Sequence, residues 1–193
     1  DNSASSGESS DYVELLDWLE SHPLDSDENY RYVATKIDVD NFINYQQTEI
    51  YANNRDWPSN NLKKWRGRNP ATPWRGFLYD MDFGFGNDMS EYTNNIFEFA
   101  AAEDGPDWPN GPKSTFLFRK LLENKSFTNK FVNRMSTLLA TNFEKTRVLA
   151  RIDAMMGEIS AEVARDQKRW GHSAKWMDQV LDDMKYFAES RES

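Results

Sequence analysis

Cysteine is absent from this sequence of 193 residues, and only two histidines occur. The absence of cysteine excludes disulfide bonds, thiolate nucleophiles and cysteine-ligated metals, and it allows export from the cytoplasm without demonstrating it. Long hydrophobic runs are also missing, because no apolar stretch approaches the roughly 18 residues that a membrane-spanning helix needs. No secretory signal peptide is recognisable. We therefore expect no membrane span and no zinc site built on cysteine.

Basic residues are fewer than acidic ones, with 23 Lys and Arg against 32 Asp and Glu, which gives a net charge of −9. This balance argues against a nucleic-acid-binding protein. The acidic excess lies in residues 1–30, whereas residues 55–75 hold six basic side chains. Local positive charge suits either an anionic ligand such as phosphate or an ordinary solvated hairpin face, and the sequence leaves both open. The six residues are Arg55, Lys63, Lys64, Arg66, Arg68 and Arg75.

Hydrophobic periodicity predicts a mainly α-helical fold with one small β-hairpin near the middle. A polar, serine-rich segment at residues 1–10 is expected to be flexible, and one domain is expected to span residues 11–193. The connection at residues 87–112 is long, which in a compact domain favours a functional role. Expected helices cover about residues 11–22, 28–36, 39–53, 116–124, 127–141, 145–168 and 176–190, and expected strands cover 62–66 and 74–79.

Two local patterns give more detailed predictions for the helices. Asp11 and Glu14 have the spacing of a capping box at the start of the first helix, and Pro23 ends that helix. The longest helix carries an apolar stripe that we expect to lie in the core. This stripe consists of Leu149, Ile152, Met156, Ile159 and Val163.

Two carboxylates, Asp80 and Asp82, follow the apolar segment at residues 77–78. Residues i and i+2 of a strand point the same way, so both carboxylates are expected on one side. Two carboxylates this close repel each other unless a cation lies between them, and Mg²⁺ or Mn²⁺ prefers such oxygen ligands. A pair of turn or capping carboxylates is the alternative.

The expected hairpin brings a third polar side chain to this place. If the chain turns between residues 70 and 71, Trp65 faces Gly76 and Asn61 faces Asp80. Opposed Cβ atoms in a hairpin lie roughly 5 Å apart, which is close enough for two side chains to share one metal ion. A shift of one residue would turn Asn61 away.

Asp56 and Asn61 lie just before the hairpin with the spacing D-x-x-x-x-N. In the catalytic loop of protein kinases, this spacing joins an Asp that accepts the proton of the substrate hydroxyl to an Asn that binds a second metal ion. A hairpin then leads to a metal-binding Asp, in the order found here. The spacing alone is common by chance, but together with the hairpin and Asp80 it indicates phosphoryl transfer.

Other catalytic motifs are absent or incomplete. Gly84 and Gly86 do not complete a dinucleotide-binding fingerprint, because position 89 is Met. No P-loop, H-E-x-x-H zinc motif or G-x-S-x-G nucleophile elbow occurs. A glycosyltransferase with an Asp-x-Asp metal site remains open, although its nucleotide-binding α/β region should precede the motif, and residues 1–54 are predicted to be helical.

The segments that carry these motifs resemble the spore coat protein H (CotH) kinase family over about residues 11–190. The resembling segments are VDNFINY at 39–45, NNRDWPSNN at 53–61, YDMDFGFG at 79–86, FRKLLEN at 118–124, FVNR at 131–134 and RWG at 169–171. The resemblance implies an atypical kinase, secreted or located in a spore coat. Such a kinase uses ATP with Mg²⁺ or Mn²⁺ to phosphorylate Ser or Thr of protein substrates.

Carried over to this sequence, the resemblance makes Asp56 the catalytic-loop Asp. It makes Asn61 and Asp80 ligands of the metal and its nucleotide, and Asp82 a second carboxylate near the metal. The literal D-F-G at residues 82–84 is an alternative for the metal-binding position. Asp80 is favoured because it directly follows the apolar strand and faces Asn61.

The family's nucleotide-binding lobe should precede these motifs, but residues 1–54 contain no phosphate-covering loop and no strand lysine paired with a helix glutamate. We therefore expect this chain to be an atypical kinase-like C-lobe without its N-terminal lobe, and to be inactive alone. Its expected partners are that lobe and a protein substrate bearing Ser or Thr, at an extracytoplasmic location. The alternative is a non-catalytic kinase-like scaffold or cell-surface binding module.

Overall fold

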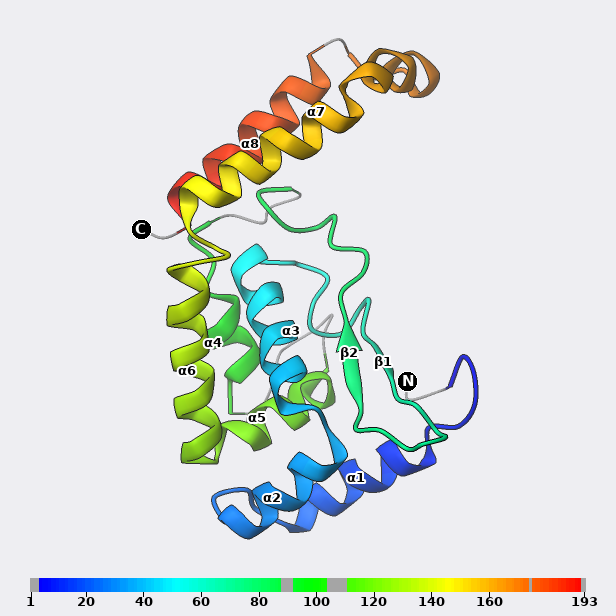
Figure 1. Ribbon diagram of the computed structural model, residues 1–193, viewed down its shortest axis with the longest axis vertical. Coiled ribbons are helices and arrows are strands. Elements are labelled where there is room, and N and C mark those ends of the chain that lie inside the picture. The colour runs from blue at the N-terminus through cyan, green and yellow to red at the C-terminus, as the bar shows by residue number, and fades with distance from the viewer. Residues whose placement is uncertain (1–3, 88–91, 104–110, 174, 192–193) are drawn as a thin grey trace.

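A computed structural model describes residues 4–87, 92–103, 111–173 and 175–191 of the chain. This part of the chain is mainly helical and contains one antiparallel pair of strands, β1 (Lys63–Trp65) and β2 (Arg75–Phe77) (Figure 1). No described helix combines the length and the apolar character needed to cross a membrane. The helices are α1 (Ser10–Ser21), α2 (Asp27–Lys36), α3 (Val39–Ala52), α4 (Ile96–Ala101), the short 3₁₀-helix η1 (Pro112–Thr115), α5 (Phe116–Leu122), α6 (Lys125–Leu139), α7 (Lys145–Trp170) and α8 (Trp176–Ser190).

Helix α3 runs through the middle of a helical body, and the other elements are arranged around it (Figure 1). It contacts α6 on one side and strand β2 on another, while α5 packs against α1, α4 and α6. Helices α1 and α2 lie at one end of this body. At the opposite end, α7 and α8 form an antiparallel pair that extends away from it (Figure 1).

Two groups of buried side chains hold these elements together. The larger group fills the body with aromatic and aliphatic side chains from α1, α3, α5 and α6. The smaller group lies where α7 and α8 meet the end of α3, and it consists of Tyr51, Val148, Ile152 and Ala188. Because burial of one large apolar side chain contributes about 1.5–3 kcal/mol, the larger group supplies most of the hydrophobic stabilisation.

The side chain of Asn41 fixes the hairpin to α3. Its amide nitrogen donates to the carbonyl oxygen of Gly76 at 3.1 Å, and its amide oxygen accepts the Gly76 N–H at 2.8 Å. A Cβ atom at position 76 would lie 3.3 Å from the ring of Tyr45, so glycine allows β2 to approach the helix closely. The hairpin therefore has a defined position on α3.

Asp38 joins the start of α3 to the same strand. Its side chain accepts the Asn41 N–H at 3.0 Å and pairs with the guanidinium of Arg75 at 2.8 Å. The Asn41 N–H and, to a smaller extent, the Arg75 guanidinium lower the pKa of Asp38. The carboxylate thus caps the helix and holds the strand at the same time.

The predicted mainly helical fold with one β-hairpin is confirmed, and the helices begin and end within a few residues of the expected positions. The predicted capping box at Asp11 is wrong. Helix α1 begins at Ser10, and the carboxylate of Asp11 pairs instead with Arg66 of the hairpin. A tertiary ion pair therefore replaces the local contact that the spacing with Glu14 had indicated.

The connection expected at residues 87–112 contains the helix α4. Its N-cap is Asn95, whose side-chain oxygen accepts the N–H of Glu98 at 3.1 Å. Residues 88–91 and 104–110 of this connection lie outside the described residues.

The second half of α7 does not lie in the core, contrary to the expected apolar stripe. Ile152 is 7% exposed, but Ile159 is 53% exposed, and Met156 and Val163 are only partly buried. The pair of α7 and α8 extends beyond the body at this point, so no third element of the described chain covers the stripe (Figure 1). Helical periodicity identified the helix correctly but not what lies beside it.

Arg191, directly after α8, ties the helical pair to the end of α3. Its guanidinium donates to the carbonyl oxygens of Ile50 at 2.7 Å and Tyr51 at 3.0 Å. It also donates to those of Tyr92 at 2.5 Å and Asn94 at 3.2 Å. Burial lowers the pKa of this guanidinium. Because the last carbonyls of a helix have no partner within the helix, one cation satisfies several acceptors at once.

Replacing Arg191 with Met is expected to destabilise the protein, because these carbonyl oxygens lose a charged donor. The cost is about 2–4 kcal/mol, which lowers Tm by roughly 5–15 °C in a domain of this size. Melting curves followed by circular dichroism measure the effect. Arg165→Met is the matched control, because Arg165 is exposed and pairs only with Glu162 one turn away, and it should change Tm little. Equal melting temperatures for the two variants would contradict the assigned role of Arg191.

Candidate active site

The segment that leads from α3 to the hairpin begins with two buried asparagines. Asn53 ends α3 in the left-handed backbone conformation, with a φ of 51°, which turns the chain away from the helix axis. The amide nitrogen of Asn54 donates to Oε2 of Glu49 at 2.9 Å, and its amide oxygen accepts the N–H of Asp56 at 3.1 Å. The contacts from Glu49 through Asn54 therefore fix the backbone of Asp56.

Glu49 is a buried carboxylate on the last turn of α3, with 2% of its surface exposed. Burial raises the pKa of Glu49, and the hydrogen bond from Asn54 opposes this effect. Tyr45, one turn earlier, is also buried, and burial together with the nearby Glu49 raises the pKa of its hydroxyl. Glu49 thus supports the loop from inside the protein.

Asn61 brings the two loops of the site together. Its side-chain nitrogen donates to Oδ2 of Asp56 at 3.0 Å and to the main-chain oxygen of Asp80 at 3.2 Å. Asn61 and Asp80 both have a left-handed backbone conformation, with φ values of 55° and 54°. This conformation costs a residue with a side chain about 1–2 kcal/mol, and such residues cluster at functional sites. Three of the four predicted site residues are therefore adjacent in space.

The residues that follow Asp80 fold back onto the end of α3. The N–H of Arg55 donates to the carbonyl oxygen of Phe83 at 3.0 Å, and the N–H of Phe85 donates to that of Ala52 at 2.9 Å. Gly84 lies against the same helix end, where an added Cβ atom would be 3.1 Å from the Ala52 oxygen. Main-chain hydrogen bonds thus hold the second loop in place.

Asp82 lies in the turn between these contacts and is exposed to solvent. Its main-chain oxygen accepts a hydrogen bond from the side chain of Asn87 at 2.6 Å. Within the described chain, no hydrogen bond joins its carboxylate to Asp56 or Asn61. The structure therefore brings Asp56, Asn61 and Asp80 together and leaves Asp82 outside their hydrogen-bonded contact.

The predicted register of the hairpin is wrong by one residue. Trp65 pairs with Arg75 rather than with the next residue, so Asn61 does not stand opposite Asp80 in the ladder. The reason lies in the loop at residues 67–72, whose first and last residues are joined by two hydrogen bonds. These contacts place the turn earlier than the expected position between residues 70 and 71.

Strand β2 also ends earlier than predicted, at Phe77. Asp80 has a left-handed backbone conformation, so Asp80 and Asp82 do not follow the alternation of a strand, and the argument that placed them on one side fails. Asn61 reaches Asp80 nevertheless, through its side chain and the main-chain oxygen of Asp80.

The oxygen atoms of this site suit a hard divalent cation. Asp80 and Asp82 have exposed carboxylates. The Asn61 side chain donates to Asp56 through its amide nitrogen and also has an amide oxygen that can act as a ligand. Mg²⁺ prefers oxygen ligands and usually keeps several waters or phosphate oxygens. Across the ranges that the structure describes, no three acidic, histidine or cysteine side chains form a ready-made metal cluster. The residues present thus fit a cation that takes most of its ligands from elsewhere.

The arginines of the hairpin pair with acidic residues, two of which lie near the N-terminus and one at the start of α3. The pairs are Arg66 with Asp11, Arg68 with Glu8 and Arg75 with Asp38. The ammonium groups of Lys63 and Lys64 lie over the rings of Tyr79 and Tyr12, at 4.4 and 5.0 Å from the ring centroids. The arginines therefore fit the hairpin-face interpretation, and the acidic N-terminal segment has a structural role in pairing with them.

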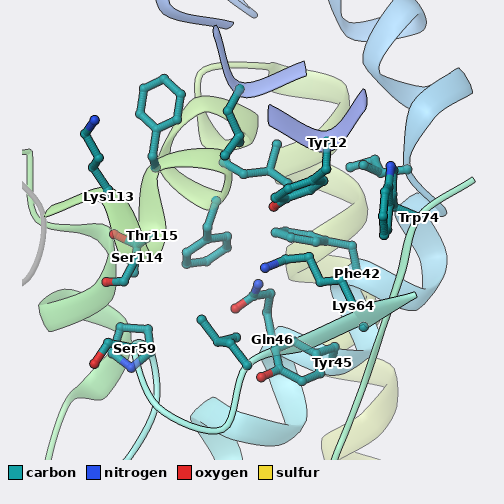
Figure 2. A pocket seen from close by; sticks show the side chains of 18 of the residues that line it. Tyr12, Phe42, Tyr45, Gln46, Ser59, Lys64, Trp74, Lys113, Ser114 and Thr115 are labelled. Atoms are coloured by element: carbon teal, nitrogen blue, oxygen red, sulfur yellow. The ribbon is translucent and has the colours of Figure 1, made fainter. Parts of the chain in front are cut away.

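A cavity of about 570 Å³ lies between α1, α3, the hairpin and α5 (Figure 2). Trp57, Pro58 and Ser59, which directly follow Asp56, form part of its wall. Sequence reasoning missed this cavity, because its walls come from segments that are far apart in the chain. One signal was visible, since Gln46 interrupts the apolar stripe of α3 and lines the cavity.

Glu49→Gln is expected to raise Tm at neutral pH by a few degrees, because it removes a charge that is unfavourable when buried and retains an acceptor for Asn54. Burial raises the pKa of Glu49 in the folded protein. The contribution of Glu49 to the stability of the wild-type protein is therefore most favourable below the ordinary glutamate pKa of about 4.3, and it is lost as the pH rises through the higher folded-state pKa. The gain of the variant should therefore vanish near pH 4. Thermal melts from pH 4 to pH 8 measure it, with the exposed Glu158→Gln as control. A gain that is constant with pH would contradict this role of Glu49.

Comparison with known proteins gives one match. The family model described as CotH kinase protein matches residues 1–193, the whole of this sequence. No curated protein and no solved structure matches the chain significantly. The kinase-like C-lobe that the resemblance implied therefore has no structural neighbour to compare with. The family match covers every segment on which the resemblance was based, including both loops of the site, and the chain belongs to the CotH kinase protein family.

Proposed function

We propose that this chain is the catalytic lobe of a protein kinase that transfers the γ-phosphate of ATP to Ser or Thr of a protein substrate. One observation carries the proposal: the Asn61 amide contacts both the carboxylate of Asp56 and the main chain of Asp80. This contact joins the two segments that have the spacing of a kinase site. Membership of the CotH kinase family supports a kinase-like protein. In this proposal a further part of a longer protein supplies the nucleotide-binding lobe.

Asp56 is the proposed proton acceptor. Its N–H is held by Asn54, and Oδ2 of its carboxylate accepts from Asn61, so the side chain has a fixed orientation. As the substrate hydroxyl oxygen bonds to the γ-phosphorus, the bond from that phosphorus to the β–γ bridging oxygen breaks and ADP leaves. The hydroxyl proton passes to Oδ1 of Asp56. The side chain is only partly buried, which allows a protein substrate to reach it.

Asp80 and Asn61, with Asp82 as a further carboxylate, are the proposed ligands of Mg²⁺ or Mn²⁺ with ATP. When bound, the metal neutralises the negative charge that develops on the transferred phosphoryl group. Asn61 has a second role in this proposal, because its contacts with Asp56 and Asp80 keep the proton acceptor at a fixed position relative to the metal-binding segment.

The proposed partner is a protein that bears Ser or Thr, and the proposed location is extracytoplasmic, either secreted or in a spore coat. Both follow from the family resemblance, and the absence of cysteine is compatible with that location.

Asp56→Asn and Asp80→Asn are expected to lower the rate of phosphorylation in the full-length protein by about 10²- to 10⁴-fold, because they remove the proton acceptor and a charged metal ligand. Asp82→Asn should lower the rate less. All three variants should keep a Tm close to the parent, and the exposed Asp25→Asn serves as control. ATP-dependent phosphorylation and a melting curve are measured for each variant. Near-parental rates for folded Asp56→Asn and Asp80→Asn proteins would overturn the kinase proposal in favour of a scaffold.

The chain alone is expected to bind Mn²⁺ weakly, with a Kd on the order of millimolar, because the protein supplies few ligands. It is also expected to show no useful phosphoryl transfer, because in this proposal another part of a longer protein supplies the nucleotide-binding lobe. Paramagnetic broadening of amide NMR signals locates the ion. Broadening should be strongest at Asn61, Asp80 and Asp82. Broadening restricted to the acidic residues of α1 and α2 would contradict the assigned metal site.

A further inference from the structure

The cavity adjoins the loop that carries the proposed proton acceptor and also includes Leu62, which follows Asn61, but it does not include the two carboxylates proposed to bind the metal. Its wall includes Trp57, Pro58 and Ser59, the three residues that follow Asp56, whereas neither Asp80 nor Asp82 lines it. A ligand that extends from the cavity along this loop therefore approaches the carboxylate that takes the substrate proton. This position points to the protein substrate, and not to the nucleotide.

The walls of the cavity are rich in aromatic rings. Its lining includes Tyr12, Phe42, Tyr45 and Trp74 (Figure 2). The ring centroids of Tyr12 and Trp74 lie 5.4 Å apart, and the two rings are arranged edge to face. Charged side chains also line the cavity, among them Asp17, Lys64 and Lys113, so its wall combines aromatic and polar parts. A large apolar or aromatic side chain gains the most from removal of its surface from water in such a place.

Gln46 is a buried polar residue of the cavity wall. The residue is 6% exposed, and its side-chain oxygen Oε1 is buried without a hydrogen-bond partner in the described chain. Figure 2 shows the amide of Gln46 and the side chain of Lys64 extending into the cavity. A buried acceptor without a partner costs about 1–3 kcal/mol, and because Oε1 has almost no accessible surface, a ligand donor removes this cost only when the amide turns its oxygen toward the cavity. An amide offers one donor and one acceptor group, which complements the N–H and C=O of a peptide bond.

The distance along the loop sets where the ligand's side chain lies relative to the phosphorylated residue. Ser59 is three residues from Asp56 in a turn that the Asn60 N–H closes by donating to the Asp56 carbonyl oxygen at 3.0 Å. The backbones of Asp56 and Ser59 therefore lie roughly 5–6 Å apart, a distance that about two extended residues of a substrate span. A substrate whose hydroxyl lies at Asp56 and whose backbone is extended therefore reaches the cavity with a side chain two or three positions away.

We propose that the cavity binds the acceptor protein, and that it selects a large apolar or aromatic side chain two or three residues from the phosphorylated Ser or Thr. This inference rests on the proposed kinase function. In it, the aromatic walls surround the selected side chain, and the Gln46 amide bonds to the neighbouring peptide group of the substrate.

Binding and transfer are measured separately with short synthetic peptides. Each peptide has one Ser in a background of Gly and Ala, and a single Tyr, Leu or Ala is placed at each of the three positions on either side. Fluorescence anisotropy of the labelled peptides gives Kd for the chain without ATP. Peptides with Tyr or Leu two or three residues from Ser should bind at least roughly tenfold more tightly than the Ala peptide. The full-length protein should phosphorylate them with a correspondingly lower KM.

Two neighbouring glutamines provide a matched pair of variants. Gln46→Leu removes the unpaired acceptor, so it should leave Tm unchanged or higher while it weakens binding of the Tyr peptide several-fold. Gln47 does not line the cavity, and its amide donates to the carbonyl oxygen of Phe131. Gln47→Leu should therefore lower Tm by a few degrees and leave the Kd of the peptide unchanged. The pair separates a ligand-binding role from a structural one.

The outcomes distinguish this inference from the proposed function. Selective binding of the Tyr and Leu peptides that Gln46→Leu weakens supports the cavity assignment, even if the full-length protein transfers no phosphate, in which case only the kinase proposal fails. Phosphorylation that does not depend on the flanking residue or on Gln46 overturns the cavity assignment and leaves the kinase proposal intact. Displacement of the peptide by ATP alone, without Mg²⁺, would identify the cavity as a nucleotide site and also overturn the inference.

Discussion

The C-terminal end of α3 is the point on which the arrangement of the candidate site depends. The final carbonyl groups of a helix lack partners within the helix, and in this protein segments from three parts of the chain supply them. The Asn54 N–H bonds to the Glu49 oxygen, the Phe85 N–H bonds to the Ala52 oxygen, and Arg191 bonds to the two carbonyls between them. The loop at residues 53–61, the segment after Asp80 and the end of α8 therefore meet at one helix terminus.

Buried polar groups at this terminus require complete pairing. Glu49 and Asn54 are almost fully buried, and a buried amide or carboxylate without partners is strongly unfavourable. The amide of Asn54 meets this requirement by contacting Glu49 on one side and the Asp56 N–H on the other. A loop backbone that is fixed in this way keeps its position although it is part of no strand or helix. A site made of side chains from two loops requires such a fixed backbone.

Local patterns predicted much of this structure. Helical periodicity predicted the helices other than α4 and η1, and the D-x-x-x-x-N spacing identified Asp56 and Asn61, which are in contact. The predicted register of the hairpin failed because hydrogen bonds within residues 67–72 place the turn before the assumed position between residues 70 and 71. Asn61 contacts Asp80 through its main-chain oxygen, and not as the opposed pair of side chains that was predicted.

Other features have no local signal that would have revealed them. Arg191 binds carbonyls that lie about 100 residues or more earlier in the chain, and nothing near it in the sequence indicates those partners. The exposed stripe on α7 has the same spacing as a buried one, because periodicity reports the face of a helix and not the presence of a neighbour. The roles of Asn54 and Gln46 likewise depend on what surrounds them.

The extended pair of α7 and α8 has a consequence for the order in which the protein loses structure. The pair has its own small group of buried side chains and meets the body at the end of α3, partly through the stacked rings of Tyr51 and Phe143. Segments with few buried apolar contacts open at a lower free energy than the body to which they are attached. Opening of this pair withdraws Arg191 from the end of α3 while the larger core remains intact. Amide protons of the loop at residues 53–61 are therefore expected to exchange with solvent through partial opening rather than only through global unfolding, and this loop shares the lower local stability of helices that lie outside the main core.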